Sequence, residues 1–348
     1  MEIIPDISII VPVFNRPRLI KECIQSVIDQ THENWELLVV DDGSNDETVE
    51  VVESFSKTDK RIKLIERKQL PKGAQHCRNI GIKNAVGEYI IFLDSDDLLA
   101  PFCLRQRLLE MKHADKLDFL VFPQMVFNDK PGDSPLLINI ATSEPALNRF
   151  FTLVHCLDVP WITTGPIFKR SSIINKTLEW NISTKGFQDV EFNVSAIVAG
   201  LSFEYAAKPA DNYHRVHSES RIGDAIYSLG TTASSEKMLL RLFQRIEKGG
   251  LLTEELKLRI SKSFFYVVVE KLVLANKRAD AFNALKKMKQ VRMISKILYF
   301  QIRFYIFFNA PYFKSFNNLR NKIIYRFWRN SIYKRTDENY LKHSHLSQ

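Results

Sequence analysis

Short apolar runs alternate with segments of helical periodicity over the first hundred residues of this 348-residue chain, and this alternation limits the folds open to it. The runs expected to be buried strands are residues 8–14, 35–40, 62–65 and 89–93. The segments expected to be helices are residues 18–30, 46–55 and 74–85. Because an intervening helix lets successive strands pair in parallel, the pattern predicts a doubly wound α/β sheet.

The fourth expected strand ends in an acidic cluster, Asp94, Ser95, Asp96 and Asp97. Carboxylates crowded at the end of a buried strand repel one another and lose hydration, and a hard divalent cation relieves both costs. Ligands of open α/β sheets bind just outside the carboxyl ends of the strands. The cluster therefore predicts an Asp-x-Asp metal site; the alternative is an acidic loop that caps a helix at residues 101–113.

The second expected strand also ends in an acidic stretch, DDGSND at residues 41–46, which could equally be a turn followed by a helix cap. No G-x-G-x-x-G follows the first strand, and no G-x-x-x-x-G-K-[ST] occurs in the chain. These absences disfavour a dinucleotide-binding domain and a P-loop.

Other segments are less regular. The helix at residues 74–85 has small side chains on its inner stripe, so we expect it to lie close against the sheet. Residues 119–127 are expected to form a strand, 160–169 an irregular apolar segment and 192–199 a helix. The four cysteines form no C-x-x-C pair, which predicts buried thiols in a reducing compartment.

From about residue 226 the pattern becomes helical, with helices expected at residues 237–246, 254–276 and 279–289. We therefore expect a catalytic α/β domain at residues 1–225 and a helical region at 226–348. No signal peptide is recognised, and no apolar run approaches the ~20 residues that span a bilayer.

The formal net charge of +9 resides in the tail, residues 291–348, which contains 11 Lys/Arg and two Asp/Glu. The other 290 residues are neutral, so the basicity is no evidence for nucleic-acid binding by the catalytic part. The tail also holds 14 of the 39 aromatic residues, which predicts association with an anionic membrane surface. The alternative is packing on the catalytic domain, or on a second subunit in a homodimer.

Five motifs in order resemble those of the family 2 glycosyltransferases, which are inverting enzymes with a GT-A fold. They are VPVFNRP at residues 11–17, VVDDGSND at 39–46, KGAQHCRNIGIKNAVGEYIIFLDSDD at 72–97, GFQDVEF at 186–192 and YHRVHSES at 213–220. The resemblance covers about the first 220 residues. It implies a Rossmann-like, mostly parallel sheet flanked by helices, with the helical region as a C-terminal extension.

The resemblance also implies a nucleotide-sugar donor, most often a UDP-sugar, and Mn²⁺ or Mg²⁺. The residues it implies for donor binding are Pro12, Phe14, Asp42, Arg78, Asp94, Ser95, His214 and Arg215. Of these, Pro12 and Phe14 would line the nucleobase pocket, Asp42 would accept a hydrogen bond from uracil, and His214 with Arg215 would meet the diphosphate. The residues it implies for the metal are Asp96, Asp97 and His217.

Asp189 would be the general base that takes the proton of the acceptor hydroxyl. The family often has Glu-Asp here, whereas this chain has Gln188 and Asp189. Glu191 is the competing candidate, but two residues further along a helix it would point elsewhere. Residues of the acceptor site are expected at Trp161, Thr164 and Gly165.

The expected function is the metal-assisted transfer of a sugar, with inversion, to a lipid-linked saccharide acceptor. The pathway would be the synthesis of a bacterial cell-surface polysaccharide. The enzyme would be cytoplasmic and peripheral on the inner membrane. One alternative is a catalytically inactive homologue that acts as a binding module; the retained acidic residues argue against it. A second is a sugar nucleotidyltransferase, although the Gly-rich signature of that class is missing near the first strand.

Overall fold

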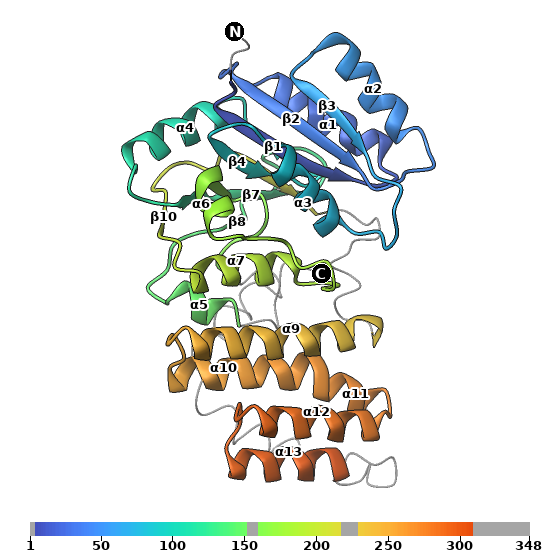
Figure 1. Cartoon of the computed structure of the whole chain (residues 1–348), viewed down its shortest axis with the longest axis vertical. Coiled ribbons are helices and arrows are strands. Elements are labelled where there is room, and N and C mark those ends of the chain that lie inside the picture. The colour runs from blue at the N-terminus through green and yellow to red at the C-terminus, as the bar shows by residue number, and fades with distance from the viewer. Residues whose placement is uncertain (1–3, 152–158, 217–228, 309–348) are drawn as a thin grey trace. The chain divides into compact units, whose positions relative to one another are not determined.

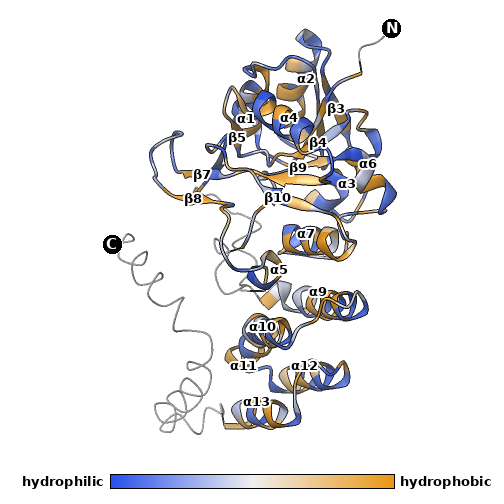
Figure 2. Ribbon diagram, turned by 90° about the vertical axis from the view of Figure 1, so that its left-hand side faces the viewer, coloured by the Kyte–Doolittle hydropathy of each residue, from blue (hydrophilic) through white to orange (hydrophobic). Residues whose placement is uncertain are grey.

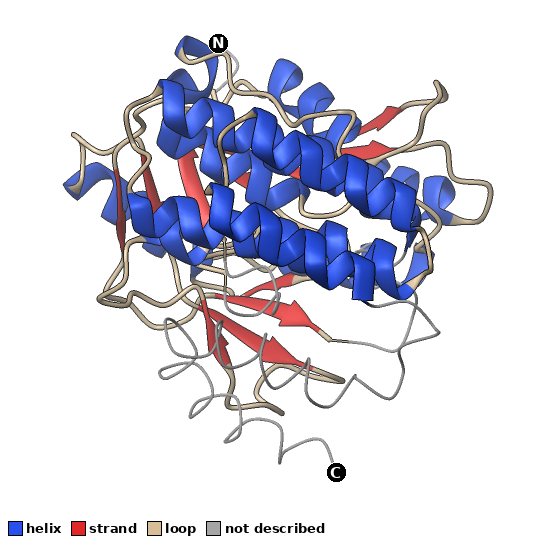
Figure 3. Cartoon of the chain, turned by 90° about the horizontal axis from the view of Figure 1, so that it is seen from below, coloured by secondary structure: helices blue, strands red, loops and turns tan. Residues whose placement is uncertain are grey.

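The computed structural model describes residues 4–151, 159–216 and 229–308 (Figure 1). The chain divides into two compact units, Met1–Lys271 and Leu272–Gln348. All the described strands belong to the first unit, and from residue 229 to residue 308 the described chain contains only helices and loops (Figures 1 and 3). The fold is mixed α/β with a parallel-rich central sheet, as the sequence predicted.

The central sheet of the described chain has the strand order β10-β6-β9-β4-β1-β2-β3. Its strands are β1 (Ile7–Val13), β2 (Trp35–Asp41), β3 (Ile62–Glu66), β4 (Tyr89–Phe92), β6 (Phe119–Val121), β9 (Pro166–Lys169) and β10 (Phe203–Tyr205). Strand β9 is antiparallel to both of its neighbours, and the other pairs are parallel. The expectation of an irregular segment at residues 160–169 is therefore wrong for its last four residues.

A second, smaller sheet has the order β5-β11-β7-β8 within the described residues. Its strands are β5 (Leu98–Leu99), β7 (Gln124–Phe127), β8 (Leu137–Ile138) and β11 (Asn212–Arg215). The single strand expected at residues 119–127 is instead two strands, β6 and β7, in different sheets. Pro123 lies between them, and it cannot donate a backbone hydrogen bond to a ladder.

The helices that follow the first strands are α1 (Pro17–Ile28), α2 (Thr48–Thr58), α3 (Ala74–Asn84) and α4 (Cys103–His113). Helix α1 begins with proline, whose missing N–H costs nothing at a helix start. Helix α3 packs tightly on the sheet: a Cβ added to Gly81 would lie 2.3 Å from Cγ2 of Ile10. This confirms the close approach predicted from its small residues.

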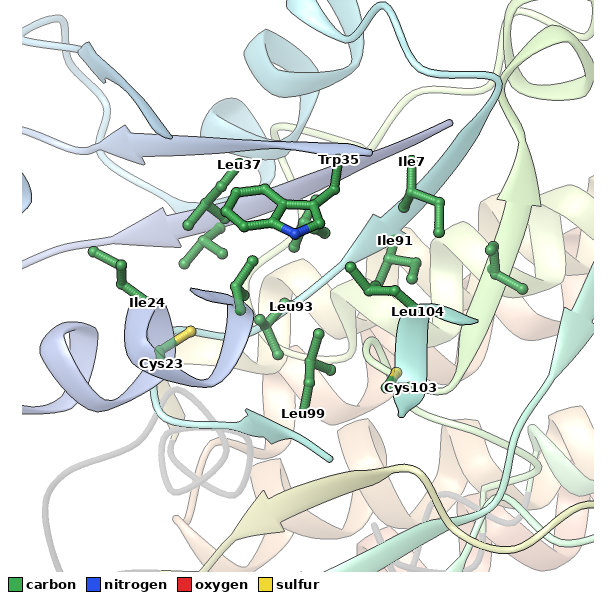
Figure 4. Packing of buried hydrophobic residues seen from close by; sticks show 14 of the residues in the cluster. Ile7, Cys23, Ile24, Trp35, Leu37, Ile91, Leu93, Leu99, Cys103 and Leu104 are labelled. Atoms are coloured by element: carbon green, nitrogen blue, oxygen red, sulfur yellow. The ribbon is translucent and has the colours of Figure 1, made fainter. Parts of the chain in front are cut away.

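The main core lies between the sheet and helices α1, α2 and α4 (Figure 4). Leu37 and Ile91 from the strands face Ile24 of α1 and Leu104 of α4, all buried. Cys23, Cys77 and Cys103 are free thiols and buried, which confirms the predicted burial of these three; Cys156 lies outside the described residues. The hydrophobic colouring of the central strands in Figure 2 reflects burial on both faces.

Across the other face of the sheet, an aromatic cluster holds α7 (Gln188–Val198) in place. Trp180 stacks on Phe192 with 4.4 Å between ring centroids, and Phe92 of β4 meets both rings edge-on. Arranged in this way, aromatic rings bury large apolar areas with defined geometry. Helix α7 is thereby fixed beneath the strand that carries the acidic cluster.

The remaining helices are α5 (Ala146–Arg149), α6 (Arg170–Asn175), α9 (Leu229–Lys248), α10 (Glu254–Phe264), the π-helix η2 (Phe265–Glu270), α11 (Lys271–Leu274), α12 (Arg278–Gln290) and α13 (Lys296–Phe308). The division between the compact units falls later than the sequence-based boundary at residue 226. The reason is that α9 packs on α7, and α10 on α5, within the first unit. In the second unit α12 packs on α13.

No helix among the described residues has both the length and the apolar character needed to cross a membrane.

Candidate active site at the carboxyl edge of the central sheet

The parallel strands β1, β2 and β4 end at one edge of the sheet, and the polar motifs of the sequence follow these ends. At the end of β2, the carboxylate of Asp41 accepts hydrogen bonds of 2.9 Å from the backbone N–H groups of Gly43 and Ser44. Gly43 has φ +76°, a left-handed conformation that suits glycine. Asp41 therefore forms the turn, and Asp42 is the residue of the pair left for another role.

Asp42 is buried beside the guanidinium of Arg67, which donates to its Oδ1, and beside the backbone N–H of Gly73, which donates to its Oδ2. Arg67 in turn donates from Nη2 to the carbonyl of Pro71 at 2.6 Å. The sequence analysis missed Arg67. The sequence pattern that could have identified it is a basic residue directly after β3. Because β3 pairs with β2, this residue lies close to the acidic residues at the end of β2.

The two residues predicted to line a nucleobase pocket differ in exposure. The ring of Phe14 is exposed at this edge, and Nζ of Lys72 lies 3.8 Å from its centroid. Pro12 is buried inside β1, opposite Val40. Phe14 therefore exposes an aromatic ring directly after Val13, whose carbonyl accepts a hydrogen bond of 2.9 Å from the backbone N–H of Asp42. Pro12 is covered and can only support the strand.

Arg78 joins three segments of the site. It extends from α3, is buried, and donates from Nη2 to Oδ1 of Asp94 at 2.6 Å. Its Nη1 lies 3.4 Å from Oε1 of Gln188 at the start of α7, and its guanidinium carbon is 4.3 Å from the centroid of the Trp180 ring. One positive charge thus connects the acidic cluster after β4 with the first turn of α7.

Asp189 lies in that first turn and is partly buried. Burial raises the pKa of its carboxyl, while the charges of Arg78 and His214 act in the opposite direction. Gly186 (φ +74°) and Phe187 (φ +52°) are both left-handed, and they turn the chain into α7. The structure therefore brings Asp94, Arg78 and Asp189 to one place, and burial of Asp189 favours the protonated form of its carboxyl.

Glu191, the competing candidate, is occupied elsewhere. It is buried, and Arg241 of α9 donates from Nε to its Oε1 at 3.0 Å and from Nη2 to its Oε2 at 3.1 Å. Asn181 donates to Oε1 at 3.0 Å, and the hydroxyl of Thr184 donates to Oε2. Four donors leave this carboxylate no position for a substrate proton, so Glu191 fastens α7 to α9.

Asp96 and Asp94 carry the exposed charge of the acidic cluster. Asp96 pairs with Nη1 of Arg16 at 2.8 Å, and both side chains remain partly exposed. Burial raises the pKa of Asp94, the charges of Asp97 and Asp96 raise it further, and Arg78 opposes them. Ser95, between the two acids, is buried.

Asp97 is fully buried, and its oxygens are taken up by the protein. Oδ1 accepts from the backbone N–H of Arg215 at 3.1 Å, and Nδ1 of His214 lies 3.1 Å away. Oδ2 accepts from Thr164 at 3.0 Å and from Gln124 at 3.3 Å. With each oxygen holding two partners, no lone pair remains for a metal, and we interpret Asp97 as structural rather than as the metal ligand predicted.

The histidine-containing segment is only partly described. His214 is partly exposed and orients toward Asp97, near enough to Asp189 to influence its pKa. Arg215 is buried, donating from Nε to the carbonyl of Asp96 at 3.0 Å and from Nη2 to Glu22, so the diphosphate contact expected of it is not supported. His217 lies outside the described residues.

The residues expected to form the acceptor site lie in the interior. Trp161 is fully buried, with its ring 4.9 Å from those of Phe150 and Phe203. The carbonyl of Thr164 accepts from Arg107 at 2.9 Å, and Gly165 has no room for a Cβ. This acceptor-site expectation is wrong, because these side chains support the Asp97 network and the aromatic core.

Within the described residues, no three His, Cys, Asp or Glu side chains are grouped as ligands for a metal ion. The lack of such a group does not conflict with metal binding by the carboxylate of Asp96, because Mg²⁺ and similar hard cations are often held by one or two carboxylates together with substrate phosphates. A single carboxylate at the edge of the sheet fits such a cation.

Comparisons with known proteins show what the sequence and the fold are similar to. The model of the family described as Glycosyl transferase family 2 matches residues 8–172. EpsJ of Bacillus subtilis, described as an uncharacterized glycosyltransferase, is 31% identical over 196 residues, which are 56% of each chain. An uncharacterized glycosyltransferase of Rickettsia felis is 51% identical over 92 residues, which are 26% of this chain and 15% of that protein. The chain thus spans less than two thirds of the length of either relative.

Among solved structures, S. aureus TarS 1-349 in complex with UDP-GlcNAc superposes with a TM-score of 0.69 at 17% identity, over 91% of both chains. This likeness shows a shared fold. The match of residues 8–172 covers β1 to β4, the residues of the DSDD cluster and β9, so this part of the chain is a glycosyl transferase family 2 domain.

Proposed function

We propose that the chain is an inverting glycosyltransferase that moves a sugar from a nucleotide-sugar to the hydroxyl of a saccharide acceptor. The observation that carries this proposal is the meeting of Asp94, Arg78 and Asp189 at the carboxyl edge of the sheet. It places a positive charge beside a carboxylate of raised pKa, where an open α/β sheet binds its ligand. The match of residues 8–172 to the glycosyl transferase family 2 model supports the same reaction class.

The proposed donor is a UDP-sugar. Phe14 presents an exposed aromatic ring on which a base can stack, and the adjoining Val13 is hydrogen-bonded through its carbonyl to the backbone N–H of Asp42. Asp94, held by Arg78, is suited to accept hydrogen bonds from ribose hydroxyls. The related fold of TarS, whose complexes hold UDP-GlcNAc and UDP, is consistent with this choice.

In the proposed reaction Asp189 accepts the proton of the acceptor hydroxyl while that oxygen attacks the anomeric carbon. The bond from that carbon to the nucleoside diphosphate breaks on the opposite side, so the configuration is inverted. The raised pKa of Asp189 strengthens it as a base, and Arg78 supplies positive charge near the leaving group. Asp96 would hold Mn²⁺ or Mg²⁺, which when bound neutralises charge on the departing diphosphate.

The proposed acceptor is a lipid-linked saccharide at the cytoplasmic face of a bacterial membrane. Its support is the basic and aromatic tail, because such an acceptor must be reached at a membrane surface.

The test is to incubate the full chain with UDP- and GDP-sugars, with Mn²⁺ or Mg²⁺, and to measure release of nucleoside diphosphate. We expect release from a UDP-sugar, its loss in excess EDTA and its recovery when metal is restored. Asp96→Ala should lose this activity, whereas Asp29→Ala, which removes an exposed carboxylate at the end of α1, should retain it. Turnover that is insensitive to EDTA, or absent with every donor, would refute the proposal.

A further inference from the structure

The surface of α13 presents a row of large apolar side chains. Ile297 is 73% exposed, Phe300 62%, Phe304 56% and Phe307 61%. Their spacing of three, four and three residues places them on one side of the helix. The opposite side, with Ile302 and Ile306, is buried, and α13 packs on α12. We call the row of four residues the α13 face.

Basic residues accompany the α13 face. Lys296 and Arg303 of the same helix are exposed, and helical spacing places both at the edge of the row. Residues 272–308 contain eight Lys/Arg and a single acidic residue, Asp280. Apolar side chains bordered by cations in an otherwise basic unit are the pattern of a helix that lies in a membrane interface.

Charge distinguishes among the partners that could cover this face. Residues 309–348 contain eight Lys/Arg and two Asp/Glu, so this segment is itself basic and would repel the helix. A second copy of the same unit would bring together two surfaces of like charge. An anionic lipid surface offers both an apolar layer for the phenylalanines and phosphates for the cations.

We propose that the α13 face docks on an anionic lipid bilayer, with the helix parallel to the surface. Phe300, Phe304 and Phe307 enter the boundary between headgroups and acyl chains, while Lys296 and Arg303 contact lipid phosphates. With 13 residues, α13 is too short to span the bilayer and is suited to lie on it. The inference does not depend on the proposed reaction, because it concerns attachment alone.

The experiment is sedimentation of the full chain with vesicles of phosphatidylcholine, with and without 30% phosphatidylglycerol. We expect binding to the anionic vesicles at low salt and release at high salt. The double variant Phe300→Asp, Phe304→Asp should bind at least tenfold more weakly, and Arg303→Glu several-fold more weakly. Because these side chains are exposed, both variants should keep the wild-type melting temperature.

The control is Leu274→Asp, which places one such carboxylate at an apolar position that is 77% exposed but lies outside α13. It should bind vesicles as the wild type does. Undiminished binding of the double variant would overturn the proposal, as would equal binding to neutral vesicles. If the double variant instead converted a dimer to a monomer while vesicle binding persisted, a second copy would be the partner and the lipid proposal would be wrong.

Discussion

Asp96 and Asp97 are adjacent in the chain, and Asp189 and Glu191 are two residues apart, yet within each pair the surroundings differ. Asp96 meets a partly exposed arginine and Asp189 has a raised pKa, whereas Asp97 and Glu191 are buried and the carboxylate of each is contacted by four donor atoms. We call Asp94, Asp96 and Asp189 the reactive edge, and the groups bound to Asp97 and Glu191 the supporting networks.

The comparison teaches that occupancy by protein donors, more than residue type, separates a chemical role from a structural one. A buried carboxylate whose lone pairs all accept hydrogen bonds from the protein is already solvated by these donors. It does not readily give them up to bind a substrate. A carboxylate that is desolvated without full compensation keeps a raised pKa, and so keeps affinity for a proton. Variants of the two classes should therefore affect different measurements.

The largest effect is expected for Asp189→Asn. The amide cannot accept the acceptor proton, so the rate of transfer should fall about 10²–10⁴-fold, or roughly 2.7–5.5 kcal/mol in the barrier. Binding of UDP should be retained. Steady-state rates and UDP titration would measure both, and an activity close to the wild type would remove Asp189 from the reactive edge.

For the same variant we also predict the sign of the change in unfolding free energy. Because the pKa of Asp189 is raised by folding, its ionisation weakens the fold as pH rises, and the full penalty applies above the folded pKa. Asp189→Asn should therefore match or exceed the wild type in unfolding free energy at neutral pH. The difference should vanish below the ordinary carboxyl pKa of 3.8. A lower stability at pH 7 would contradict the assigned shift.

The next effect separates Asp97 from Asp96. Asp97→Ala removes the acceptor of four donors, three of them on buried residues, and should cost about 3–5 kcal/mol of unfolding free energy, as when a buried pair loses one member. Asp96→Ala breaks a partly exposed pair and should cost less than about 1 kcal/mol. Urea unfolding of both variants is the measurement. Equal losses would show that the two carboxylates do not differ as described.

The smallest effect on transfer is expected for Glu191→Gln. Exchanging one oxygen for an amide nitrogen loses the ion pair with Arg241 and should lower the unfolding free energy by about 1–3 kcal/mol. Transfer by the folded protein should stay within a few-fold of the wild type, because the carboxylate has no lone pair for a substrate. A rate loss like that of Asp189→Asn would reverse the roles of the two residues.

The described strands and helices of the first hundred residues agree closely with those predicted from the sequence. The reason is that the spacing of apolar residues in each element shows which of its sides is buried. Four strands and the helices between them were predicted within a few residues. The antiparallel strand β9 was missed, since its direction depends on pairing with β4 and β6 and leaves no local pattern. Arg67 was missed for a similar reason, as its partner Asp42 precedes it by 25 positions.

By itself, the sequence determined that acidic groups follow the ends of parallel strands, and therefore that they share one edge of a sheet. Only the tertiary structure decided which of these groups are taken up by donors of the protein itself. The partners that occupy Asp97 include His214, 117 positions away, and Glu191 is held by Arg241, 50 positions away. Local periodicity reflects the burial of apolar side chains, whereas the hydrogen bonds that use up a carboxylate come from distant segments brought together by folding.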